Sequence, residues 1–305
     1  ARFSLAPLRA LGPFAGGVAA TTLLGLLLTQ LDKVVLSRLL SLESFGYYAL
    51  AAYLAGAIQQ LIVPIAQAYY PRLSQLVAAG DEGAVARTYH DAAQLVTVLI
   101  APAALLLILF GEQGLRLWTG NAGLAAATAP LLCLLAAGSL LNGCMSVPYN
   151  LQLAHGWSQF AVRVNLVAVL VFVPALLWVA PLYLAVGTAW LWVALNLGYF
   201  LIGMHFMHRR LLPRDKWTWY GADILAPLGT CCAVMLVLRL WMPGAMSRAA
   251  ELAWLVASGA AGLGAAVAAL AELHAAAATI ARLAGTGGIS ASEARWGLVA
   301  LLAST

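Results

Sequence analysis

The chain has 305 residues, of which 63% are hydrophobic and only 9% are charged. Water-soluble domains usually carry about 25% charged residues, so this composition and a mean hydropathy of +0.91 exclude a soluble globular protein. The formal net charge is +5, and most basic residues lie in short segments between long apolar ones. Because membrane proteins concentrate Lys and Arg in their cytoplasmic loops, this pattern predicts no nucleic-acid partner.

Eight apolar segments are long enough to cross a bilayer, whose core of about 30 Å requires about 20 residues of helix. The sequence therefore predicts an all-α integral membrane protein with about eight transmembrane helices. In chain order these cover residues 14–40, 45–70, 92–110, 124–151, 157–179, 182–207, 224–241 and 249–270. Pro71 is expected to end the second helix, and Pro181 to form a tight turn between the fifth and the sixth.

The segment PRLSQLVAAGDEGAVARTYHDAAQLV, residues 71–96, follows the second predicted helix. Its apolar residues are spaced as in short helices, with a turn at Gly80-Asp81-Glu82-Gly83. We expect these helices to lie along the membrane surface; a solvated connector is the alternative.

Loop charges predict the orientation of the helices. With a cytoplasmic N-terminus, ten Lys and Arg residues lie on the inner side and five at outer ends, which favours cytoplasmic placement of both termini. The inner ten are Arg2, Arg9, Arg72, Arg87, Arg209, Arg210, Arg214, Lys216, Arg282 and Arg295, and the outer five are Lys33, Arg38, Arg116, Arg239 and Arg248.

Five stretches carry a family resemblance. They are LTQLDKVVLSRLLSLESFGYYALAAYLAG, IVPIAQAYYPRLSQLVAAGDEGAVARTYH, GEQGLRLWTGN, LLNGCMSVPYNLQLAHG and HFMHRRLLP. In this order and spacing they resemble the second lobe of the polysaccharide flippases. These are the O-antigen and capsule translocases of the multidrug/oligosaccharidyl-lipid/polysaccharide exporter superfamily. The resemblance covers residues 2–212 and contains no catalytic signature.

Members of that family have two lobes of six helices, often followed by two more helices. The resemblance therefore implies three parts for this chain. Residues 1–212 would form the C-terminal six-helix transporter lobe, residues 213–273 two additional transmembrane helices, and residues 274–305 a cytoplasmic tail. The first lobe would lie outside this chain.

The function that the resemblance implies is translocation of an undecaprenyl-diphosphate-linked oligosaccharide from the cytoplasmic to the periplasmic leaflet of the bacterial inner membrane. This step belongs to the biosynthesis of cell-surface polysaccharide, such as the O-antigen of lipopolysaccharide. The implied partners are the lipid-linked oligosaccharide, membrane lipids, and the polysaccharide polymerase and chain-length machinery. The phosphate-binding pattern G-x-x-x-x-G-K-[ST] is absent from the sequence, so we expect no nucleotide cofactor; coupling to H⁺ or Na⁺ is left open.

Three other functions compete with this one. A multidrug or cation antiporter of the same superfamily would favour acidic and aromatic cavity residues, whereas this lobe offers cations. A membrane enzyme such as a polymerase or ligase would require a large outer loop with catalytic Arg or His; the outer loops are short, so we expect no enzyme. An inactive half-transporter fragment is the third alternative.

Asp32 and Lys33 are charged residues inside the first apolar segment. A lone charge at the bilayer centre costs about 3 kcal/mol, so such residues usually pair or face a cavity. Neighbouring helix residues point about 100° apart, so one can face a cavity and the other an adjacent helix. We expect Lys33 to bind the substrate phosphate and Asp32 to tune it or carry a coupling proton. The alternative places both near the outer headgroups, with Lys33 snorkelling.

Amides are the second group of candidate substrate ligands, because they both donate to and accept from sugar hydroxyls. Gln60 and Gln67 are seven residues apart and share a helix face, which indicates a polar stripe on a cavity. Asn142 and Asn150 are candidates of the same kind, and Gln30, Gln59, Gln152 and Asn196 are further amides in apolar segments. Hydrogen bonds between helices, of about 1 kcal/mol each, are the alternative role.

Arg163 lies one to two turns into the fifth predicted helix. Its planar guanidinium would suit a diphosphate group, so it completes the candidate substrate site. The alternative is snorkelling to the inner interface.

Overall fold

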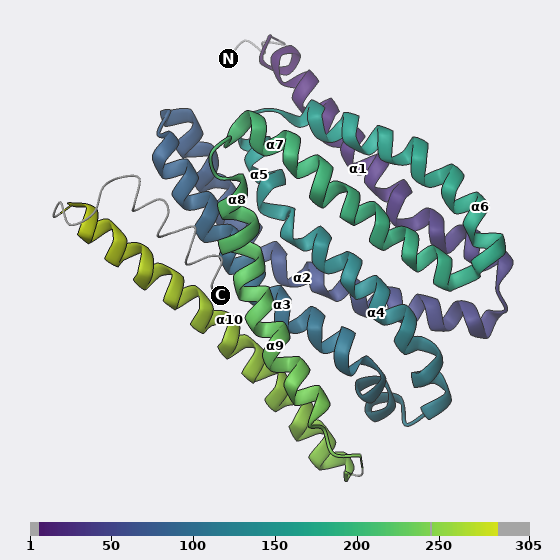
Figure 1. Cartoon of the computed structure of the whole chain (residues 1–305). Coiled ribbons are helices and arrows are strands. Elements are labelled where there is room, and N and C mark those ends of the chain that lie inside the picture. Colours follow the sequence, from purple (N-terminus) through teal and green to yellow (C-terminus); the bar gives the residue numbers. More distant parts are fainter. Residues whose placement is uncertain (1–5, 245, 286–305) are drawn as a thin grey trace, which may run out of the picture.

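The computed structural model describes residues 6–244 and 246–285, and this part of the chain is helical with no strand (Figure 1). The α-helices are α1 (Ala6–Leu39), α2 (Leu42–Ala79), α3 (Glu82–Thr119), α4 (Ala122–Cys144), α5 (Ser146–Ala154), α6 (Ser158–Gly198), α7 (Met204–Leu211), α8 (Lys216–Thr218), α9 (Ala226–Leu240) and α10 (Arg248–Gly285). Two π-helical segments join them, η1 (Tyr199–Gly203) and η2 (Trp219–Leu225). The all-α membrane fold predicted from composition is confirmed.

Helix α6 contains two crossing segments rather than one. Its backbone leaves helical geometry at Leu184, where φ is 51° and ψ is −137°. The Tyr199 hydroxyl donates to Asn165 Oδ1 at 2.9 Å, although a straight helix would hold residues 34 apart at about 50 Å. The described residues contain seven apolar helical spans, and the one from Ser158 to Leu211 folds back on itself. This turn gives the eight predicted crossings.

The predicted end of the second helix at Pro71 is wrong, and residues 71–96 form no separate short helices but belong to the long helices α2 and α3. Helix α2 continues through Pro71 to Ala79, because Leu73 and Leu76 on its extension are buried in the core. Such packing outweighs the hydrogen bond that a proline removes. The predicted turn does occur: Gly80 ends α2 with φ 72°, and the Asp81 carboxylate accepts from the Ala84 N–H at 2.9 Å to begin α3.

The predicted single helix over residues 124–151 is broken at Met145. Pro148 has no N–H, so it cannot pair with the carbonyl of Cys144 four residues earlier. Helix α4 ends at Cys144, the Met145 N–H bonds back to the Asn142 carbonyl at 3.1 Å, and α5 starts at Ser146. The break re-aims the side chains of α5 relative to those of α4.

The helices form a layered bundle (Figure 1). Helix α1 packs mainly on α6 at one side, α2, α3 and α4 form the centre, and the pair α9 and α10 packs on α3 at the other side. Helix α10 reaches Gly285, so it continues past residue 273, where the predicted tail starts. Residues 286–305 of that tail lie outside the described part.

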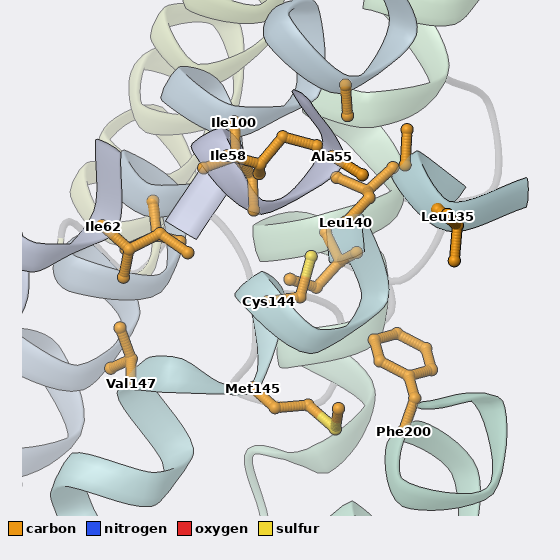
Figure 2. Packing of buried hydrophobic residues seen from close by; sticks show 14 of the residues in the cluster. Ala55, Ile58, Ile62, Ile100, Leu135, Leu140, Cys144, Met145, Val147 and Phe200 are labelled. Atoms are coloured by element: carbon orange, nitrogen blue, oxygen red, sulfur yellow. The ribbon is translucent and has the colours of Figure 1, made fainter. Parts of the chain in front are cut away.

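The core between α2, α3, α4 and α5 is closely packed and apolar. Figure 2 shows Ile58 and Ile62 of α2, Ile100 of α3, Cys144 of α4 and Val147 of α5 gathered in it. Glycines permit the close approach of neighbouring helices. A Cβ atom added at Gly138 of α4 would overlap the ring of Trp192 in α6, and one at Gly143 would lie 2.7 Å from Ile100 Cδ1.

The substitution Gly138→Val is therefore expected to destabilise the bundle by about 1–3 kcal/mol, the usual range for overpacking. Thermal unfolding in detergent measures this. Gly264→Val is the matched control, because the exposed Gly264 has no atom within 4 Å of an added Cβ. The second change Trp192→Leu should restore part of the loss. Equal melting of the two glycine variants would contradict the close α4–α6 contact.

Candidate functional site

A polar hollow of about 580 Å³ lies between α1, α2, α4 and α6. Four predicted site residues line it: Asp32, Lys33, Gln60 and Asn142. We call it the charged hollow, because Asp32 and Lys33 are the acidic and basic residues of its lining. Candidate residues of the first, second and fourth apolar segments thus meet in one place.

The charged pair has a defined geometry. The Tyr48 hydroxyl donates to Asp32 Oδ2 at 2.5 Å, and Asp32 Oδ1 lies 3.7 Å from Lys33 Nζ. Lys33 Nζ also donates to the Thr29 carbonyl at 2.7 Å. The Asp32 side chain is 14% exposed and that of Lys33 34%, so the ammonium is the more accessible charge. A lysine has three N–H donors, which leaves capacity to bind an anion in the hollow.

Three amides form a hydrogen-bonded chain across the helices. Gln59 Nε2 of α2 donates to Asn142 Oδ1 at 3.3 Å, and Asn142 Nδ2 of α4 donates to Asn196 Oδ1 at 2.8 Å. Asn196 of α6 is fully buried and donates to the Trp192 carbonyl at 2.8 Å. We call Gln59, Asn142 and Asn196 the amide chain. Asn142, a predicted site residue, therefore both lines the charged hollow and joins helices through hydrogen bonds, which is the alternative role expected for these amides.

A second hollow, of about 290 Å³, lies among α2, α4, α5, α6, η1 and α7. It shares Gln59 and Asn142 with the charged hollow, so the amide chain borders both. Its other polar lining residues are Ser146, Tyr149, Gln152, Asn165 and Tyr199. Asp, Glu, Lys, Arg and His do not occur among its lining residues, and we call it the uncharged hollow. Ser146 and Gln152 reach it because the break at Met145 redirects α5.

The remaining predicted site residues lie apart from both hollows. Gln67 is exposed on the same face of α2 as Gln60 but lines neither hollow. Asn150 is half-buried on α5, and Arg163 is exposed on α6; neither lines the two hollows. The polar stripe on α2 is present, therefore, and only its Gln60 end belongs to the charged hollow.

A further polar cluster joins α3 to η2. His90 Nδ1 lies 2.5 Å from Asp223 Oδ2, and Gln94 Nε2 donates to Asp223 Oδ1 at 2.9 Å. His90 Nε2 lies 3.4 Å from Asp215 Oδ1, and Asp223 is fully buried. Sequence analysis missed this cluster. Its only signal was one acidic residue at the start of an apolar segment, Asp223. In the described part of the chain, no group of His, Cys, Asp and Glu residues suits a metal ion.

These features define a multi-pass helical membrane protein with polar hollows among its helices. Residues 1–128 match a protein-family model described as polysaccharide biosynthesis protein. The matched region contains α1, α2 and α3, and with them Asp32, Lys33 and Gln60 of the charged hollow. Comparison with curated proteins finds no match. The family match and the apolar helices together support a membrane protein related to polysaccharide biosynthesis.

Proposed function

We propose that the chain is the C-terminal lobe of an exporter that moves an undecaprenyl-diphosphate-linked oligosaccharide from the cytoplasmic to the periplasmic leaflet. The observation that carries this proposal is the charged hollow, where the accessible ammonium of Lys33 lies among amides of α2 and α4. The ammonium would bind the diphosphate, and Gln60 and Asn142 would bind sugar hydroxyls. The family match over residues 1–128 supports the polysaccharide part of the proposal.

Export of an anionic lipid-linked substrate is preferred to cation antiport for a physical reason. A cation antiporter would use Asp32 as its counter-ion, yet one oxygen of Asp32 already accepts from Tyr48 and the other faces Lys33. An anionic substrate instead finds the more exposed member of the pair.

The exposed stripe of α2 is the proposed wall of the pathway. Tyr53, Gly56, Gln60 and Gln67 lie on one exposed face of this helix. Transporters of this class move substrate between two repeats that rock against each other. We place a first lobe opposite this stripe, in the inner membrane, with both termini of this chain cytoplasmic. Polymerase and chain-length proteins would take the product at the periplasmic side.

The test measures lipid-linked oligosaccharide and surface polysaccharide in cells that lack the complete gene. Build-up of intact lipid-linked units on the inner leaflet, with loss of surface polysaccharide, is the expected result. Re-expression of the gene should reverse both changes. Normal surface polysaccharide without build-up would contradict export and favour the antiporter or the inactive fragment.

A further inference from the structure

We propose that the uncharged hollow is a separate subsite for one uncharged sugar unit of the transported glycan. This inference rests on the proposed function and adds a second ligand class to it. The charged hollow would hold the diphosphate, and the uncharged hollow a neutral sugar ring. Its volume of about 290 Å³ is just below the usual range of ligand-binding cavities, about 300–1,000 Å³, so it suits a single unit rather than a long chain.

The charge of the lining selects for a neutral ligand. The polar groups of the uncharged hollow are amides and hydroxyls, and its lining residues include no Asp, Glu, Lys, Arg or His. An ionised sugar acid would lose its hydration there without gaining a counter-ion, which is costly in a low-dielectric environment. A neutral sugar presents hydroxyls that both donate and accept, as amides do.

Three polar side chains on α5 are available to such a ligand. Gln152 is only 3% exposed, lines the hollow, and makes no side-chain hydrogen bond to another described residue. Ser146 Oγ is buried without a hydrogen-bond partner in this part of the chain. The Tyr149 hydroxyl likewise bonds to none of the described residues. A buried polar group left unpaired costs about 1–3 kcal/mol, so Ser146 Oγ is arranged to be satisfied from within the hollow, where Gln152 and Tyr149 offer two further polar groups.

The polar side chains on the other walls of the uncharged hollow are already held by hydrogen bonds within the protein. The Tyr199 hydroxyl donates to Asn165 Oδ1 at 2.9 Å, and the amide chain holds Gln59 and Asn142. The ring of Phe160 lines the hollow and stacks on Trp157, with ring centroids 4.4 Å apart. Aromatic faces attract the weakly positive hydrogens of C–H groups, so Phe160 offers a platform for the apolar face of a sugar ring.

The test uses the full chain in lipid nanodiscs and ligand-observed saturation-transfer NMR. The probes are methyl β-D-glucopyranoside, methyl β-D-galactopyranoside, glucuronate and inorganic pyrophosphate, the last read by ³¹P line broadening. We expect saturation of at least one neutral glycoside and weaker saturation of glucuronate. Loss of one hydrogen bond of about 0.5–1.5 kcal/mol corresponds to roughly two- to twelvefold weaker binding. We expect that change for each of Gln152→Leu, Ser146→Ala and Tyr149→Phe.

Matched variants separate the two sites. Gln75→Leu replaces an exposed amide of α2 that lines neither hollow, and should leave glycoside binding unchanged. Lys33→Gln should weaken pyrophosphate binding and leave glycoside binding intact, whereas Gln152→Leu should do the reverse. Ser146→Ala and Tyr149→Phe each remove only a hydroxyl, so they test the subsite even if Gln152→Leu fails to fold.

Each contrary outcome has a distinct meaning. Glycoside binding that survives all three α5 variants, glucuronate binding as strong as that of the glycosides, or no glycoside binding at all would overturn the neutral-sugar subsite. In these cases Lys33-dependent pyrophosphate binding would leave the proposed export function standing. If Lys33→Gln leaves pyrophosphate binding unchanged while glycosides still bind, the result would count only against the proposed phosphate site.

Discussion

Replacing Lys33 by Gln is expected to lower the amount of surface polysaccharide by about ten- to a hundredfold at matched expression. Hydrogen bonds to a charged group contribute about 1.5–3 kcal/mol, and each 1.4 kcal/mol corresponds to a factor of ten. The substitution removes the accessible cation of the charged hollow, while the hydrogen bond from Tyr48 to Asp32 is kept. The loss would therefore fall on anion binding rather than on the α1–α2 contact.

Two other cations serve as comparisons for Lys33. Arg38 lies on the same helix, is exposed, and lines neither hollow. Arg239 lies on α9, where its Nε donates to the Leu109 carbonyl of α3 at 2.9 Å, which gives it a packing role. Arg38→Gln and Arg239→Gln should both export more than Lys33→Gln. Equal surface polysaccharide from all three, with equal amounts of protein in the membrane, would argue against a substrate role for Lys33.

The number of membrane-crossing helices could be predicted from the sequence, because the length and hydropathy of each apolar segment decide it. The stretches on either side of Pro181 predicted two crossings, and α6 turns back at Leu184 to give them. The errors occur at prolines. Pro71 looks like a helix end but lies in a helix that tertiary packing extends, whereas Pro148 looks tolerable near a helix end and accompanies a break three residues earlier. The local preference of a proline does not show whether packing against neighbouring helices will continue the helix, as at Pro71, or allow it to break, as near Pro148.

The candidate site was predictable where a polar residue stands out from an apolar segment. Asp32, Lys33 and Gln60 do so, and they meet in the charged hollow. Gln152 belongs to the same residue class, but its direction depends on the break at Met145, which hydropathy does not reveal. Arg163 shows the converse: its position in the helix was right, and its exposed face could be known only from how α6 packs.

Loss of the Asp223 carboxylate is expected to destabilise the docking of α9 and α10 on α3 by about 3 kcal/mol or more. A buried hydrogen-bonding group that loses its partner costs about 1–3 kcal/mol, more when it is charged, and the Asp223 carboxylate has two such partners, His90 and Gln94. Asp223→Ala leaves His90 without its 2.5 Å partner and Gln94 without its acceptor. Thermal unfolding in detergent, together with trypsin cleavage near the Arg214-Asp215-Lys216 linker, measures the effect.

The neighbouring carboxylates show how to separate this role from a general effect of charge. Asp91 lies on α3 beside His90 but is exposed, so Asp91→Ala should melt like the unmodified chain. Asp215 lies 3.4 Å from the other ring nitrogen of His90 and can partly replace Asp223 as its partner. The double change Asp215→Ala/Asp223→Ala should therefore cost more than the sum of the single changes. Strict additivity, or an Asp223→Ala variant as stable as Asp91→Ala, would mean that η2 is held to α3 by its apolar contacts, with Trp219 as the largest buried side chain, and not by the carboxylate.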